Sequence, residues 1–151
     1  MEAQQFEKAR TWVIRIDPGE DVLESINKFL EKNGVSQGYV AAGYGTLTRA
    51  SLHWVRHNRL PTDNLFADVE GGIEILAANG LVTEGEPHVH IALSTPTGAF
   101  GGHLEPGSKA YVLCEFVVVE LEGPTMRKPR VEISRDAEGK PVTVQRLTFG
   151  E

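Results

Sequence analysis

The sequence predicts an α+β fold with one main helix at residues 20–33 and several short strands. Two observations predict this class. A single amphipathic helical pattern occurs near the N-terminus, and from residue 39 onward only β-rich runs follow, separated by Gly, Pro, Asn and Asp. One helix among many strands is typical of α+β domains, because alternating α/β folds place a helix after each strand. The length of 151 residues matches one ordinary domain.

The first elements are a strand and the helix. Residues 11–16 are rich in β-branched and aromatic side chains and are followed by the turn residues Asp17-Pro18-Gly19, which predicts a strand. The helix that follows has acidic residues in its first turn and Gly34 where a left-handed C-cap is expected. Its apolar residues fall on one stripe, which must face a core: Val22, Leu23, Ile26, Phe29 and Leu30.

Further strands are predicted near residues 39–47, 48–56, 72–82, 88–95, 99–105 and 109–121. In the last of these, both alternating sets of side chains are apolar between Tyr111 and Leu121. Such a strand needs cover on its second face, either from the helix or from another subunit, so we expect an oligomer. Residues 124–151 are expected to form a basic extension, packed on or trailing from the domain at residues 1–123, with a hairpin around Asp136–Gly139.

Composition and charge exclude several classes of protein. With 40% hydrophobic and 24% charged residues, the chain is neither disordered nor collagenous. The net charge of −6 disfavours a general basic DNA-binding protein, because phosphate binding depends on cationic side chains. A lone Cys114 allows no intramolecular disulfide, the N-terminus lacks a secretory pattern, and no apolar run approaches the roughly 20 residues that span a bilayer. We therefore expect a soluble, cytoplasmic protein without a membrane partner.

Three of the five histidines form the most informative pattern. His88 and His90 alternate on one strand and so share a face, and His103 follows the turn at 95–98. If this turn is centred between residues 96 and 97, His90 faces His103 and His88 faces Glu105. Three imidazoles would then converge at distances suited to zinc, which binds nitrogen at about 2.0–2.1 Å. Copper, nickel and iron also accept imidazole ligands.

A second register is open. A type I turn with Gly98 as a bulge pairs His90 with Leu104 and separates the ligands, unless a further bulge at Gly101-Gly102 restores them. The alternative to a metal site is a hydrogen-bonded histidine cluster that lines a groove. Three-histidine sites with an open fourth position are typical of catalytic zinc.

Three other residues are candidates for a catalytic role beside the histidines: Glu105, Glu115 and Arg49. Glu115 interrupts an apolar strand, where a carboxylate is rarely buried unless it is paired or lines a polar site. It is interpreted as a partner of a ligating histidine, a general base, or one half of an ion pair with an arginine. His53 and His57 are expected to be exposed.

From about Arg10 to Gly123, the chain resembles the plants-and-prokaryotes-conserved (PPC) domain family. The resemblance depends on residues 15–23, on Gly43-x-Gly45-x-Leu47, on residues 71–76, on Pro87-His88-Val89-His90 and on Gly101-Gly102-His103-Leu104. It implies a twisted, largely antiparallel sheet with flanking helices, a homotrimer, and zinc held by His88, His90 and His103. Acetolactate decarboxylase has a more distantly similar fold and also places zinc on an H-x-H pair plus a histidine.

Because members of this family are often labelled as DNA-binding, the resemblance implies a DNA-associated regulatory role. This chain lacks the Arg-Gly-Arg-Pro hook of plant members, and its Gly71-Gly72-Ile73-Glu74 differs from their Gly-Arg-Phe-Glu. The alternative is a zinc-dependent lyase or hydrolase that acts on a small molecule, with Glu105, Glu115 or Arg49 assisting. A third hypothesis is a metal-dependent module for protein interaction.

Overall fold

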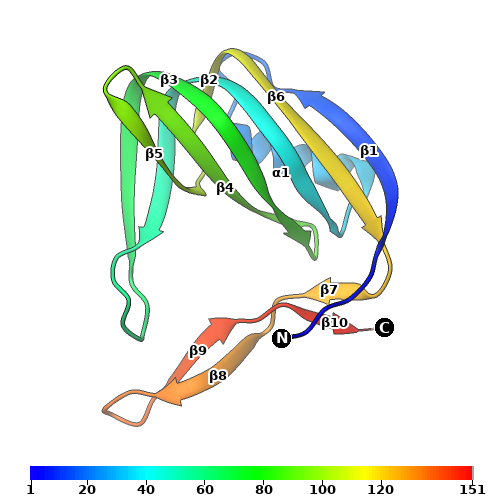
Figure 1. Cartoon of the computed structure of the whole chain (residues 1–151), viewed down its shortest axis with the longest axis vertical. Coiled ribbons are helices and arrows are strands. Elements are labelled where there is room, and N and C mark those ends of the chain that lie inside the picture. The colour runs from blue at the N-terminus through cyan, green and yellow to red at the C-terminus, as the bar shows by residue number, and fades with distance from the viewer. Residues whose placement is uncertain (151) are drawn as a thin grey trace.

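The computed structural model describes residues 1–150, which form one α-helix and ten β-strands (Figure 1). In chain order, these elements are β1 (Glu7–Arg15), α1 (Val22–Asn33), β2 (Gly38–Val55), β3 (Asn64–Thr83), β4 (Glu86–Thr95), β5 (Gly98–Leu104), β6 (Lys109–Glu122), β7 (Thr125–Arg127), β8 (Arg130–Arg135), β9 (Pro141–Gln145) and β10 (Thr148–Gly150). This composition confirms the α+β class and the single main helix.

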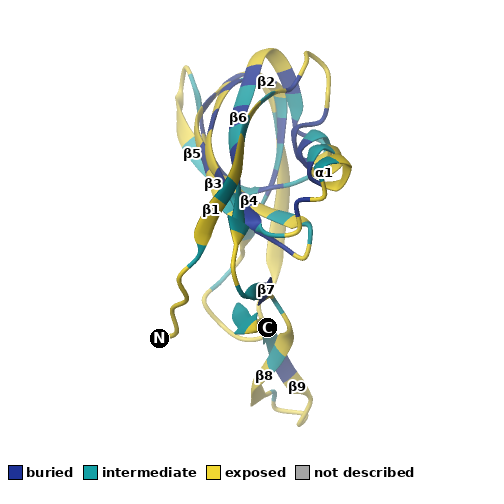
Figure 2. Ribbon diagram, turned by 90° about the vertical axis from the view of Figure 1, so that its right-hand side faces the viewer, coloured by how far each residue is buried: buried dark blue, intermediate teal, exposed yellow. Residues whose placement is uncertain are grey.

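Six strands form one antiparallel sheet in the order β1-β6-β2-β3-β4-β5. The far end of β2 also pairs with β5, so strands β2, β3, β4 and β5 close into a ring (Figures 1 and 2). A sheet can close in this way only if it is strongly twisted and curled. The ring brings β2, β4 and β5 side by side.

The helix has a side-chain cap at its start and the predicted glycine cap at its end. The side chain of Asp21 accepts a hydrogen bond from the backbone N–H of Glu24, 3.1 Å away, and so caps the first turn. Gly34 adopts a left-handed conformation with φ of 65°, which ends the helix. The helix begins at Val22 and ends at Asn33, close to the predicted bounds of 20 and 33.

Two strand predictions were wrong in length. The runs predicted at 39–47 and 48–56 form the single strand β2, and the run predicted at 72–82 is only the second half of β3. The ladder between these strands shifts register between Leu47 and Arg49. A β-bulge bends a strand without ending it, so the two predicted runs lie on either side of a bend in one long strand.

The core lies between the helix and one face of the sheet (Figure 2). On β4, Val89, Ile91 and Leu93 are buried, and they alternate with more exposed side chains that point to the other face. On β6, Phe116 is only 1% exposed and pairs across the sheet with Ile14 of β1. We call this side of the sheet the covered face and the opposite side the open face.

For strand β6, the structure decides between the helix and another subunit only in part. The helix does not cover its second face: Tyr111, Val112 and Leu113 are exposed, and Val112 is 67% exposed. Only alternate residues from Cys114 to Val118 are buried, together with Val119. The apolar side chains on the open face therefore have no cover from within residues 1–150.

The C-terminal part forms small additional sheets below the main one (Figure 1). Strands β8 and β9 form the hairpin predicted around residues 136–139, and β7 pairs with β10. Met126 of β7 is buried, and Gln37 accepts a hydrogen bond from its backbone N–H at 3.0 Å, which fastens this region to the main sheet. Within residues 1–150, no helix has the length and apolar character needed to cross a membrane.

Candidate metal centre

Strand β4 places His88 and His90 on the open face. Val89 between them is fully buried, and Ile91 after them is 3% exposed, so the alternation of the strand turns both imidazoles away from the core. Asn79 of β3 lies opposite His90 in the ladder, and Leu81 lies opposite His88. The H-x-H spacing therefore places both histidines on the same face of the sheet, as predicted.

The turn between β4 and β5 decides the register. The ladder pairs Thr95 with Gly98 and continues without a shift to His90 and His103, which confirms the first of the two predicted registers. No second bulge at Gly101-Gly102 occurs in this ladder. These glycines instead allow the ring of Trp54 to approach, since a Cβ on Gly102 would meet the indole and the indole N–H donates to the carbonyl of Gly101.

Strand β2 extends the row of histidines. The ladder between β2 and β5 pairs His53 with His103, so three histidines lie side by side across β4, β5 and β2. The ring of His53 stacks on that of His103 at 4.2 Å between centroids. His53 was predicted to be exposed, but its side chain is only 18% exposed, and His57 is also partly buried. The local sequence could not reveal this, because the contact needs the closure of the ring.

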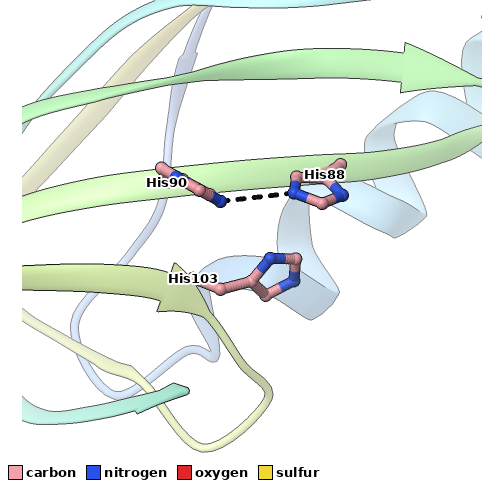
Figure 3. A group of neighbouring side chains, drawn as sticks. All are labelled: His88, His90 and His103. Carbon is pink, nitrogen blue, oxygen red and sulfur yellow. Dashed lines mark hydrogen bonds between the residues drawn. The ribbon is translucent and has the colours of Figure 1, made fainter. Parts of the chain in front are cut away.

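Three of the imidazoles converge (Figure 3). The Nε2 atoms of His88 and His90 lie 3.3 Å apart, and the ring centroids of His88 and His103 are 4.4 Å apart. Candidate ligand nitrogens of His88, His90 and His103 all lie within 4.8 Å of one another. Two nitrogens bound to one tetrahedral zinc ion lie about 3.3 Å apart, given zinc–nitrogen distances of about 2.0–2.1 Å. The spacing of this donor set therefore fits one ion.

The environment of His88 and His103 favours their neutral forms. Burial, together with the charges of Lys128 and of neighbouring histidines, lowers the pKa of His88 below its usual value. Burial and the same neighbours lower the pKa of His103 to about 4. A neutral imidazole offers a nitrogen lone pair to a metal, whereas a protonated one does not. The donor set therefore fits a divalent transition metal in its chemistry as well as in its spacing.

Glu105 lies beside the cluster but not where the simple register puts it. Strand β5 ends at Leu104, and the backbone N–H of Glu105 donates to the carbonyl of Ser51 on β2. Its carboxylate lies 2.5 Å from Nδ1 of His53 and 3.9 Å from Nε2 of His103. Glu105 therefore faces His53 rather than His88. Carboxylates placed behind ligating histidines commonly fix the orientation of the ring.

Glu115 and Arg49 are engaged elsewhere. The hydroxyl of Tyr44 donates a hydrogen bond to the carboxylate of Glu115. Glu115 is half-buried and lies on the open face, so its carboxylate is not enclosed in the core. Arg49 pairs with Asp68 at 2.6 Å and with Glu70 at 3.8 Å. Within residues 1–150, no hydrogen bond or ion pair joins either residue to the histidines. The geometry gives neither a place in the cluster.

Two cavities meet at the histidines. One of about 520 Å³ lies along β2, β3, β4 and β5, and its lining includes His53, Trp54, Asn79, His90, Ala92 and His103. The other, of about 210 Å³, lies on the side of the C-terminal part, and its lining includes Thr83, Glu84, His88, His103, Lys128 and Gln145. Nothing in the local sequence of 124–151 indicated that Lys128 and Gln145 approach the histidines.

Fold and site together define a class: a small α+β domain with a curled antiparallel sheet that presents a three-histidine cluster suited to a transition metal. The family model described as Plants and Prokaryotes Conserved (PCC) domain matches residues 3–122. The chain belongs to this family, which is the PPC family of the sequence resemblance.

Among curated proteins, the chain is similar to the bifunctional protein GlmU of Synechococcus sp. (strain JA-3-3Ab). The two are 29% identical over 146 residues, which cover 91% of this chain and 22% of that protein. The chain thus spans about a fifth of the length of the curated relatives it matches.

Solved structures share the fold. A metal-containing protein from Archaeoglobus fulgidus is 23% identical with a TM-score of 0.75, covering 97% of this chain and 99% of that one. A plant- and prokaryote-conserved (PPC) protein from Pyrococcus horikoshii is 24% identical with a TM-score of 0.73, covering 95% and 97%. A candidate DNA-binding protein from Bacteroides thetaiotaomicron is 17% identical with a TM-score of 0.68, covering 93% and 98%. Acetolactate decarboxylase from Bacillus subtilis also matches, at 14% identity, a TM-score of 0.49 and coverage of 78% and 54%, which is too distant to inform the chemistry.

Proposed function

We propose that this chain binds one zinc ion through His88, His90 and His103 and uses it to bind a small molecule in the adjoining cavities. The observation that carries the proposal is the convergence of three imidazoles on the open face, beside cavities of about 520 and 210 Å³. The metal-containing neighbour of the same fold adds support. When bound by three histidines, zinc supplies a Lewis acid and an open coordination position.

The residues of the chain would play separate parts in such a site. His88 and His90 approach from β4, and His103 approaches from β5. His53 stacks on His103, and its contact with Glu105 holds the stack in place. Because His53 stacks on a ligand, fixing its orientation also limits the movement of the His103 ring. The nonpolar wall formed by Trp54 and Ala92 would shelter a bound molecule from water.

The test is elemental analysis of protein purified without an affinity tag. We expect about one zinc ion per chain in the wild type, and none in His90→Ala or His103→Ala. His57→Ala is the matched control, because His57 accepts a hydrogen bond from the backbone of Arg59 outside the cluster. Loss of metal in the control, or metal retained in both cluster variants, would reject the proposal.

A homotrimer is proposed as the assembly, as the family resemblance implies. Its support is the apolar patch that β1, β2 and β6 leave exposed, formed by Val13, Tyr44, Tyr111, Val112 and Leu113. Apolar patches of this kind mark interaction surfaces in soluble proteins. Light scattering is expected to give three times the mass of the chain for the wild type and a smaller mass for Val13→Arg. A monomeric wild type would reject the trimer.

A DNA-associated role is the second candidate, favoured by the name of the Bacteroides neighbour. The net charge of −6 weighs against it, and we assign the phosphate contacts to the exposed Arg127 and Arg130 of the C-terminal part. If they bind phosphates, charge reversal at both should abolish binding of a labelled duplex and its salt dependence. Unchanged binding would reject this version.

The proposed cellular location is the cytoplasm. The single thiol of Cys114 is buried and free, which fits a reducing compartment.

A further inference from the structure

Lys128 is the one lysine that lines cavities at the histidine cluster among residues 1–150. It follows β7 and lines the cavity of about 210 Å³ together with His88 and His103. It also lines a neighbouring cavity of about 240 Å³ together with His88 and His90. A residue that borders both cavities lies next to the cluster itself. The C-terminal part thus adds a side chain to a site built by β4 and β5.

The ammonium group of Lys128 is half-buried and has no carboxylate partner within 4.0 Å among residues 1–150. The nearest acidic contact is through the backbone: Glu84 accepts a hydrogen bond from the N–H of Lys128 at 3.3 Å. This bond fixes the main chain at Lys128 and leaves the side chain free. Because a half-buried cation without a counterion is unfavourable, such groups usually meet an anion when the site is filled.

The surroundings of Lys128 strengthen this argument. Lys128 shares one cavity with His88 and His103 and the other with His88 and His90, so it borders all three rings of the cluster. A divalent ion on these histidines would place a second positive charge beside the first. Glu84 and Glu86 also line the cavity of about 210 Å³, but among residues 1–150 no carboxylate lies within 4.0 Å of the Lys128 ammonium, and Glu105 faces His53 on the other side of His103. Two neighbouring positive charges attract a ligand that carries a negative one.

We propose that the ligand of this site is a small anion, a carboxylate or a phosphate, that binds the metal and forms an ion pair with Lys128. Gln145 of β9 lines the same cavity and offers an amide N–H to the anion. The cavity of about 210 Å³ lies below the roughly 300 Å³ of typical drug-sized sites, which restricts the ligand to a few heavy atoms beyond its charged group. This inference rests on the proposed metal site and names the class of molecule that it binds.

The experiment uses the full chain loaded with cobalt(II), whose visible spectrum reports on ligands that enter its coordination sphere. The protein is titrated with malonate, with inorganic phosphate and with imidazole, which is neutral at the pH of the assay. The variants are Lys128→Met and Lys128→Arg, which retains the charge. The matched control is Lys140→Met, because Lys140 lies in the C-terminal part but is 74% exposed and pairs with Glu138.

We expect malonate or phosphate to bind about tenfold more weakly to Lys128→Met, since hydrogen bonds to charged groups contribute strongly to affinity. Lys128→Arg and Lys140→Met should bind the anion like the wild type, and imidazole should bind all four proteins equally. The anion whose affinity falls in Lys128→Met shows whether the ligand of the site is a carboxylate or a phosphate.

Three results would overturn the inference. Equal anion affinity in wild type and Lys128→Met would remove Lys128 from the site, while imidazole binding showed that the metal site itself is intact. Wild-type protein that binds imidazole but neither anion would exclude an anionic ligand. Protein that takes up no cobalt would reject the proposed metal site, and the inference with it. Far-UV circular dichroism of Lys128→Met checks that an altered affinity does not come from misfolding.

Discussion

The two faces of the sheet differ in what holds their side chains. On the covered face, Val89 and Phe116 are almost fully buried and belong to the core that the helix residues also form. On the open face, one residue away along the same strands, lie His90 and Glu115. The covered face therefore provides the stability, and the open face is free to carry polar groups whose arrangement serves binding. A strand with a period of two lets one sequence satisfy both demands.

The largest effect that separates the faces is expected from Phe116→Ala. Truncation of this buried ring should lower the free energy of unfolding by about 3–5 kcal/mol, because it removes apolar contacts and leaves a cavity. Val13→Ala, at a side chain 75% exposed, should change it by less than about 0.5 kcal/mol at low protein concentration. Urea denaturation of both variants measures the difference.

The same experiment sharpens the comparison when it is repeated at high protein concentration. If another subunit covers Val13, the effect of Val13→Ala will grow with concentration, since assembly stabilises the folded state by mass action. Phe116→Ala should show no such growth in its own effect. If Val13→Ala lowered the free energy of unfolding as much as Phe116→Ala at every concentration, Val13 would be buried within the single chain, which would contradict its assignment to the open face.

Metal is expected to have the next largest effect, and it acts on the open face. Zinc at a hundred times its dissociation constant should stabilise the wild type by about 2.7 kcal/mol, because it binds only the folded chain. Thermal denaturation with zinc and with a chelator measures this gain. His90→Ala should lose the gain while keeping the stability of the metal-free protein. A metal-free His90→Ala protein that is strongly destabilised would show that the histidine also has a structural role.

A smaller effect is expected where the helix joins the covered face. Asp21 is 7% exposed, and its carboxylate accepts hydrogen bonds from the backbone of Glu24 at 3.1 Å and of Gly107 at 2.6 Å. Asp21→Ala should therefore lower the free energy of unfolding by about 1–2 kcal/mol. Asp17→Ala is the control, since Asp17 is exposed and pairs only with Arg15. Equal effects of the two variants in urea denaturation would contradict the assigned role of the cap.

The sequence predicted those features that depend on neighbours within one hairpin. The C-cap at Gly34 follows from local chemistry, and the pairing of His90 with His103 is one of the two registers that the turn at residues 95–98 allowed. The prediction that β2 is two strands failed, because a bulge at Leu47–Arg49 resembles a boundary in the sequence.

The parts of the site that could not be predicted come from distant segments. His53 reaches His103 only because β2 closes the ring with β5, and Lys128 reaches His88 only because the C-terminal part folds back onto the sheet. Neither contact has a periodicity or a spacing that a single sequence displays. The direction of Glu105 was also unpredictable, because it depends on where β5 ends and on the position of His53.

The last comparison uses a thiol reagent to measure the accessibility of two consecutive residues of β6, Leu113 and Cys114. Burial raises the pKa of the Cys114 thiol to about 12, and the side chain is fully buried, so at pH 8 it is protonated and inaccessible. The folded wild type should therefore not react with a thiol reagent, and it should react with one equivalent once unfolded.

The variant Leu113→Cys combined with Cys114→Ala moves the thiol one residue along β6, to a position that is 41% exposed in the wild type. We expect this variant to react within minutes while folded, unless another subunit covers that position, in which case its rate should rise on dilution. Reaction of the wild-type thiol at the rate of the variant would mean that β6 does not hold one face against the helix, and the division of labour between the two faces would fail with it.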